Sequence, residues 1–132
     1  MRELSVQTER ESQLVDITRE VQAAVAGERG AAALVFVPHT TAGVTVNEHA
    51  DPAVARDFES ALERIVPKDW LWQHVEAGED NAPTHIRASL MGPSVLIPLR
   101  DDGSLALGTW QGVFLCEFDG PRRRSVYVSV LQ

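Results

Sequence analysis

The 132-residue sequence predicts a single α+β domain, residues 1–132, in which helices cover a largely antiparallel β-sheet. Two observations support this prediction. Short segments typical of β-strands fill the last third of the chain, and segments with helical periodicity interrupt the first two thirds. The predicted order is β-α-β-β-α-α-β-β-β-β, with no repeat, low-complexity segment or linker that would divide it.

Three short apolar segments in the first half of the chain predict strands. The first alternates apolar and polar residues, as a half-buried strand does. The second is a continuous run rich in β-branched residues, which predicts a strand buried on both faces. The third is brief and follows His39 closely. They are residues 4–8, 31–37 and 44–46.

Three helices are predicted from capping signals. The first should begin at Asp16 or Thr18 and end at Gly27 or Gly30. The second has Asp51 as a natural N-cap and Pro52 as its first residue. Its buried stripe and its stop signal are Val54, Phe58, Leu62, Ile65 and Pro67. The third is short, opens at Asn81 and Pro83, carries His85, and ends at Gly92 and Pro93.

The last third of the chain predicts four strands, over residues 94–99, 104–107, 110–118 and 124–131. The Asp-Gly pair within residues 100–103 indicates a hairpin between the first two. In the strand 110–118, one face should be the core side and the other a mixed face. The expected core face comprises Trp110, Phe114, Cys116 and Phe118. The mixed face comprises Gln111, Val113, Leu115 and Glu117.

Composition limits the classes of function. A net charge of −7, from 19 acidic and 12 basic residues, argues against nucleic-acid binding. No apolar run approaches the roughly 18 residues of a membrane-spanning helix, and the N-terminus lacks the apolar core of a signal peptide, so we expect a cytoplasmic protein. With Cys116 as the single cysteine, a metal must use His, Asp or Glu ligands.

Histidines are the first candidates for chemistry. His39, His74 and His85 lie at the ends of predicted elements or in an aromatic loop with Trp70 and Trp72, where folds commonly hold site residues. Three imidazoles can bind a divalent metal, bind an anion or move protons, and the spacing does not choose between these roles. His49 lies beside a helix start, and we interpret it as structural.

Three acidic residues follow His39. Asp51 is interpreted as an N-cap and Asp57 as a solvated or site residue. Glu48 continues the side of Val44 and Val46, so we expect it to face the histidines and to need a cation, an arginine or helix N–H groups as its partner. A basic turn at residues 122–124 is either a solvated hairpin tip or a phosphate contact.

Several ordered motifs make the chain resemble the YjbQ family, small proteins described as secondary thiamine-phosphate synthases. The resemblance covers the chain from about residue 4 to its end. The matching segments are residues 39–48 (HTTAGVTVNE), 50–52 (ADP) with Asp57, His74, 78–85 ending in NAPTH, 92–94 (GPS), 108–112 (GTWQG) and 117–122 (EFDGPR).

The resemblance implies a compact α+β fold, a homotrimer, and a site near the boundary between subunits. The mixed face of the strand 110–118 also suits burial against a neighbouring subunit. The expected catalytic residues are His39, Glu48, Asp57 and His85. The expected metal ligands, for Mg²⁺ or Zn²⁺, are His39, His74 and His85. The expected substrate-binding residues are Arg87, Trp110, Gln111, Glu117 and Arg122.

The implied activity joins a pyrimidine pyrophosphate to a thiazole phosphate, releases pyrophosphate, and is a secondary activity of the family. The partner is then a small phosphorylated metabolite, with no nucleic acid or membrane involved. Two alternatives stay open. One is a non-catalytic protein that binds a small anion or metabolite, and the other is a metal-dependent hydrolase that uses the same histidines.

Overall fold

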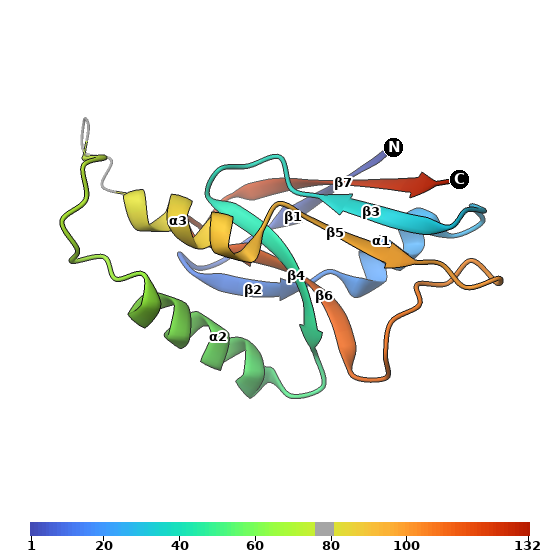
Figure 1. Cartoon of the computed structure of the whole chain (residues 1–132), viewed down its shortest axis with the longest axis horizontal. Helices are drawn as coiled ribbons and strands as arrows, with labels where there is room; N and C mark the ends of the chain where they lie inside the picture. The colour runs from blue at the N-terminus through green and yellow to red at the C-terminus, as the bar shows by residue number, and fades with distance from the viewer. Residues whose placement is uncertain (76–80) are drawn as a thin grey trace.

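Two antiparallel sheets form the domain in the computed structural model, which describes residues 1–75 and 81–132 (Figure 1). The first sheet has four strands in the order β1 (Arg2–Gln7), β7 (Arg123–Leu131), β3 (Ala32–Phe36) and β5 (Ser94–Pro98). The second has three, in the order β2 (Gln13–Asp16), β6 (Gln111–Glu117) and β4 (Ala42–Glu48). The α+β prediction is confirmed, with two sheets in place of one.

Three helices complete the described part of the chain: α1 (Thr18–Val25), α2 (Pro52–Ile65) and α3 (Ala82–Met91). Helices α2 and α3 lie on the same side of the molecule, beside the three-stranded sheet, and α1 lies at another end (Figure 1). None of the described helices is long and apolar enough to cross a membrane.

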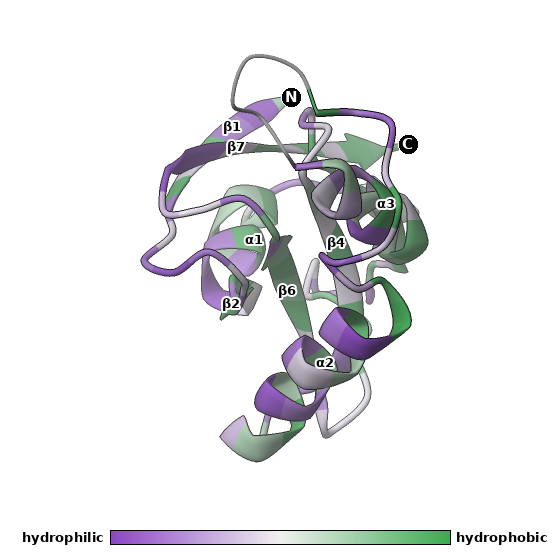
Figure 2. Ribbon diagram, turned by 90° about the vertical axis from the view of Figure 1, so that its left-hand side faces the viewer, coloured by the Kyte–Doolittle hydropathy of each residue, from purple (hydrophilic) through white to green (hydrophobic). Residues whose placement is uncertain are grey.

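The central strand β6 is buried on both faces, which explains why it is mostly hydrophobic along its length (Figure 2). Val113 and Leu115 pack between the two sheets with α1, in the larger core. Phe114 and Cys116 pack on the opposite face against α2 and α3. The prediction of a mixed face that a neighbouring subunit could bury is therefore wrong, because Val113 and Leu115 are already buried within one chain.

The buried environment of β6 also fixes the state of its cysteine. Cys116 is fully buried, as predicted, and burial raises the pKa of its thiol to about 12. Trp110 precedes the strand and is 64 % exposed, so its predicted place in the core is wrong.

Two strand predictions also differ from the structure. Strand β2 was not predicted, because its four residues are too few to show a periodicity. Residues 104–107 do not form a strand beyond one isolated bridge between Leu99 and Leu105. Side chains take the backbone groups that would extend the ladder: the Arg100 guanidinium donates to the Leu105 and Leu107 carbonyls, and Leu105 N–H donates to Gln22. The predicted tight turn is present, with Gly103 at φ 85°.

The helix boundaries follow the capping signals. Asp51 accepts a hydrogen bond from Ala53 N–H at 2.9 Å, as expected of an N-cap. Gly27 and Gly92, at φ 80° and 91°, follow the ends of α1 and α3. The stripe on α2 is only partly correct, because Phe58 and Leu62 join the smaller core while Ile65 is exposed.

Glycine brings α3 close to β4. A Cβ atom on Gly43 would lie 2.7 Å from the Gly92 carbonyl oxygen, which accepts a hydrogen bond from Val44 N–H at 3.0 Å. Only glycine permits this approach without displacement of the helix. It places the last turn of α3 against the start of β4, and His85, earlier on the helix, then reaches the connection between β3 and β4, where the site described below is found.

The outer face of the four-stranded sheet is left exposed by the residues that the structure describes. Strand β3 alternates, with Ala33 and Val35 in the core and Phe36 40 % exposed. On the paired strand β5, Leu96 is 61 % exposed. The prediction that β3 is buried on both faces is therefore wrong within one chain. The outer face of β3 is apolar, as the prediction assumed, but it is exposed.

Candidate functional site

Two of the predicted site histidines are in contact. The rings of His74 and His85 lie 5.3 Å apart between centroids, with an angle of 68° between their planes. His85 is held in the first turns of α3, and its Nδ1 atom lies 3.1 Å from the carbonyl oxygen of Thr40. His74 lies in the predicted aromatic loop with Trp70 and Trp72. Residues 76–80, which follow it, lie outside the described part of the chain.

His39 immediately precedes Thr40, so it lies in the same connection between β3 and β4. Its Nε2 atom accepts a hydrogen bond from Ser125 N–H at 2.9 Å, which leaves the proton of the neutral ring on Nδ1. Burial lowers the pKa of His39, and the positive charge of Arg124 lowers it further. His39 is thus a neutral imidazole anchored on β7.

Polar side chains from α3 and from the turn after β6 border the same region. Asn81 Nδ2 donates to Asp119 Oδ2 at 3.4 Å. Arg122 Nη2 forms an ion pair with the same carboxylate oxygen at 2.9 Å, and Arg122 Nε donates to the Asp119 carbonyl. The Asn81 Oδ1 atom is buried without a partner among the described residues. We use the name histidine corner for six residues: His39, His74, His85, Asn81, Asp119 and Arg122.

The histidine corner combines groups that can bind an anion and transfer protons. Imidazoles exchange protons near neutral pH, and the guanidinium of Arg122 carries a fixed positive charge. Within the described residues, no group of three or more His, Cys, Asp or Glu side chains is placed to hold a metal ion. Of the three expected metal ligands, His74 and His85 lie together. The Nε2 atom of His39 is already engaged by Ser125 N–H.

Glu117, an expected substrate-binding residue, is fully buried and forms an ion pair with Arg124. Its carboxylate accepts hydrogen bonds from Thr8 Oγ1, from Arg124, and from the backbone N–H groups of residues 118 and 119. Burial raises its pKa, but these hydrogen bonds outweigh burial and lower the pKa overall. No oxygen is left for a substrate in this chain, so the structure corrects the expected role to a structural one.

Arg124 lies beside the histidine corner but not in an exposed turn. It is buried at the start of β7, and its Nη2 atom also donates to Thr41 Oγ1 at 2.8 Å. The basic turn inferred from residues 122–124 therefore contains two exposed arginines, Arg122 and Arg123, and one that closes the end of the larger core.

Four other expected site residues lie away from the histidine corner. Glu48 ends β4, paired with Gln111, whereas His39 lies just before the start of that strand. Six residues of strand span roughly 20 Å, so Glu48 does not face the histidines within one chain. Its Oε2 atom is buried without a partner among the described residues. Trp110 adjoins Gln111, and Asp57 is exposed on α2.

Arg87 is separated from His85 although both lie on α3. Residues two apart on an α-helix point about 200° apart around its axis. His85 contacts the connection between β3 and β4, whereas Arg87 Nη2 donates to the carbonyl of Val66, just beyond α2, at 2.7 Å. Arg87 therefore does not share a site with the histidines in this chain.

Sequence reasoning missed Asn81 and Asp119 as members of the corner. Asn81 was interpreted only as a helix start, and its side chain makes no cap hydrogen bond. Asp119 was included only as part of the motif at residues 117–122. Both fall within the ordered motifs at residues 78–85 and 117–122, which was the signal available in the sequence.

The lowered pKa of His39 predicts a pH-dependent stability. The unfolded histidine gains its proton below about pH 6.5, whereas the folded ring resists it. The unfolded state then binds more protons, so stability should be full above this pH and should fall as the pH drops through it. Urea unfolding at pH 7.5 and 5.5 measures how far the free energy of unfolding falls between the two pH values. This fall should be smaller for His39→Gln than for the wild type, and the glutamine amide oxygen can still accept from Ser125 N–H. An equal difference in both proteins contradicts this assignment.

Fold and site together define a class of small α+β domain: two stacked antiparallel sheets, two helices (α2 and α3) on one outer face, and histidines at one corner. The family model described as UPF0047 protein YjbQ-like matches residues 2–132. The chain belongs to this family.

Relatives and solved structures agree with this assignment. A UPF0047 protein of Methanocaldococcus jannaschii is 44% identical over 96% of this chain and 90% of its own length. YugU of Bacillus subtilis is 39% identical over 99% of this chain and 98% of its own length. A crystal structure of an uncharacterised YjbQ/UPF0047 protein from Clostridium acetobutylicum superposes with a TM-score of 0.92 at 47% identity, covering 99% of this chain and 100% of that one. A conserved hypothetical protein from Thermus thermophilus gives 0.90 at 42%, with the same coverage.

Proposed function

We propose that the histidine corner binds a small phosphorylated metabolite and catalyses a thiamine-phosphate synthase-type reaction, which joins a pyrimidine pyrophosphate to a thiazole phosphate. The observation that carries the proposal is the contact between His74 and His85 at the same end of the domain as Arg122. Imidazolium and guanidinium groups are suited to neutralise phosphate charge.

In this reaction the thiazole nitrogen attacks the pyrimidine methylene carbon, a C–N bond forms, and the C–O bond to pyrophosphate breaks. No nucleophilic side chain is required, which agrees with the inert, buried Cys116. Arg122 would bind the departing pyrophosphate, and His85 would hold or donate a proton to its oxygens. Binding both substrates in register supplies much of the acceleration in reactions of this kind.

A divalent cation fits part of the corner. His74 and His85 would hold it, and imidazole ligands suit Zn²⁺ better than Mg²⁺. When bound, the ion would add positive charge beside the leaving phosphate groups. The third ligand expected from the sequence, His39, would need its Nδ1 atom, because Nε2 accepts from Ser125 N–H.

We also propose a homotrimer in which the site lies near subunit boundaries. Its support is the uncovered outer face of the four-stranded sheet, with Phe36 and Leu96, and the buried Glu48 Oε2 that lacks a partner among the described residues. The partner subunit would bring its own Glu48 end toward the histidine corner. Light scattering at low micromolar concentration should give three times the chain mass of 14.5 kDa. A monomer of 14.5 kDa would refute this part of the proposal.

Turnover tests the activity directly. The purified protein, without a His tag, is incubated with the pyrimidine pyrophosphate and the thiazole phosphate, separately with Mg²⁺, Mn²⁺ and Zn²⁺. The proposal expects the coupled product by mass spectrometry together with an equal amount of pyrophosphate. Pyrophosphate or phosphate released without the thiazole substrate would favour the hydrolase. Saturable binding without any product would favour the non-catalytic protein.

A further inference from the structure

Arg87 is a buried cation with an unused hydrogen-bond donor. The residue is only 1 % exposed. Its Nε and Nη2 atoms both donate to the Val66 carbonyl, at 3.2 and 2.7 Å, and Nη1 is buried without a partner among the described residues. No carboxylate within the described ranges lies close enough to form an ion pair with it. Burial lowers the pKa of the guanidinium, and the negative charges of Glu63 and Glu11 offset this only in part, so Nη1 lacks a direct acceptor among the described residues.

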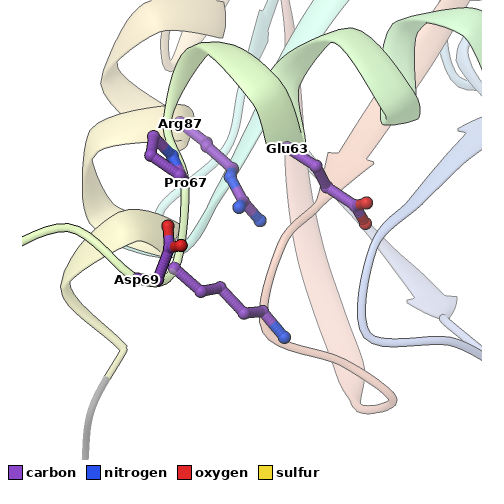
Figure 3. A pocket seen from close by; sticks show the side chains of 5 residues that line it. Glu63, Pro67, Asp69 and Arg87 are labelled. Carbon is purple, nitrogen blue, oxygen red and sulfur yellow. The ribbon is translucent and has the colours of Figure 1, made fainter.

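A pocket of about 320 Å³ adjoins this guanidinium, lined by Glu63, Pro67, Lys68, Asp69 and Arg87. The guanidinium projects past Pro67 into the space between Asp69 and Glu63, while the Glu63 carboxylate points away from it (Figure 3). Lys68 at the rim forms an ion pair with Glu11 at 2.5 Å, and its side chain is half exposed. The pocket therefore has a charged donor at its base and exposed charged groups at its rim.

We propose that this pocket binds a small molecule through a carboxylate that accepts a hydrogen bond from Arg87 Nη1, at a site separate from the histidine corner. Val66 accepts from the Nε–H and from one Nη2–H, so the two Nη1 hydrogens and the second Nη2 hydrogen of Arg87 remain for a carboxylate. The acids at the rim, Glu63 and Asp69, oppose a ligand with two negative charges, so a carboxylate fits better than a phosphate dianion.

Binding is tested with acetate and inorganic phosphate as probes, each titrated against the wild-type protein at constant ionic strength set by chloride. The readout is the NMR shift of the backbone N–H groups of Lys68 and Asp69, which line the pocket, and in the wild type also that of the Arg87 side-chain N–H groups. Acetate should give a saturable shift and should bind more tightly than phosphate. Arg87→Lys keeps the charge and a hydrogen bond to Val66 but loses the free nitrogen, and it should weaken acetate binding about tenfold or more.

A second variant keeps the test independent of folding. Glu63→Gln removes a negative charge from the exposed rim and should tighten acetate binding several-fold, whereas Glu28→Gln, an exposed acid outside the lining of this pocket, should leave it unchanged. The proposal is overturned if acetate gives no saturable shift, if phosphate binds more tightly, or if the two glutamine variants behave alike. None of these results bears on turnover at the histidine corner.

Discussion

Replacing Arg124 with methionine should lower the free energy of unfolding by about 3–5 kcal/mol, since removing one partner of a buried ion pair leaves the other charge uncompensated. Arg124 and Glu117 are both buried, and the guanidinium supplies two of the hydrogen bonds to that carboxylate. It also donates to Thr41, at the start of β4. Methionine fills a similar length of apolar space without the charge.

Denaturant unfolding of matched variants measures this loss. Arg123→Met changes the neighbouring residue, which is exposed and donates to Ser5 Oγ, and it should shift stability by no more than about 0.5 kcal/mol. Adding Glu117→Gln to Arg124→Met removes the stranded charge and should recover part of the loss. If Arg124→Met costs no more than Arg123→Met, the ion pair is not a main support of the core.

The second large effect concerns catalysis. His85→Gln should reduce the proposed turnover by about 10²-fold or more, the scale typical of a lost acid–base group. Glutamine can still donate to the Thr40 carbonyl, so the connection between β3 and β4 keeps its anchor. What is lost is the ring that carries a proton and contacts His74.

His49→Gln is the matched control for that variant. His49 pairs with Asp16 at 2.9 Å, and it packs against Gly112 on β6, outside the histidine corner. It should keep most of the turnover, although its melting temperature can fall. Equal activity of His85→Gln and the wild type would remove His85 from the mechanism. Equal losses in both variants would trace the effect to folding.

Local signals in the sequence were sufficient for the helices and for several strands. Asp51 with Pro52, and Asn81 with Gly92, define the two longer helices because capping depends on neighbours in the chain. Pairing between distant strands leaves no such signal. The burial of both faces of β6 follows from α2 and α3 packing on one face and the four-stranded sheet and α1 on the other, and neither can be inferred from the strand itself.

The site was predictable only in part, because local signals mark where elements end but not which distant elements lie side by side. His39, His74 and His85 were chosen because they lie near element ends, and the contact between His74 and His85 follows from where those ends meet. Glu48 lies at the far end of β4, whereas His39 lies just before the start of that strand. The distance between Glu48 and the histidines therefore depends on the length of β4 and on which elements surround each of its ends. Likewise, the structural role of Glu117 requires Arg124 to point inward on β7, against the appearance of a basic turn.

The position of β7 has a consequence for how the protein is made. This last strand lies between β1 and β3, and residue 2 pairs with residue 128. The partner of both strands is therefore synthesised after them, and the four-stranded sheet cannot close before residues 123–131 have emerged from the ribosome. Until then β1 has no neighbour and β3 has an open edge, a state in which a nascent chain depends on chaperones or on fast release.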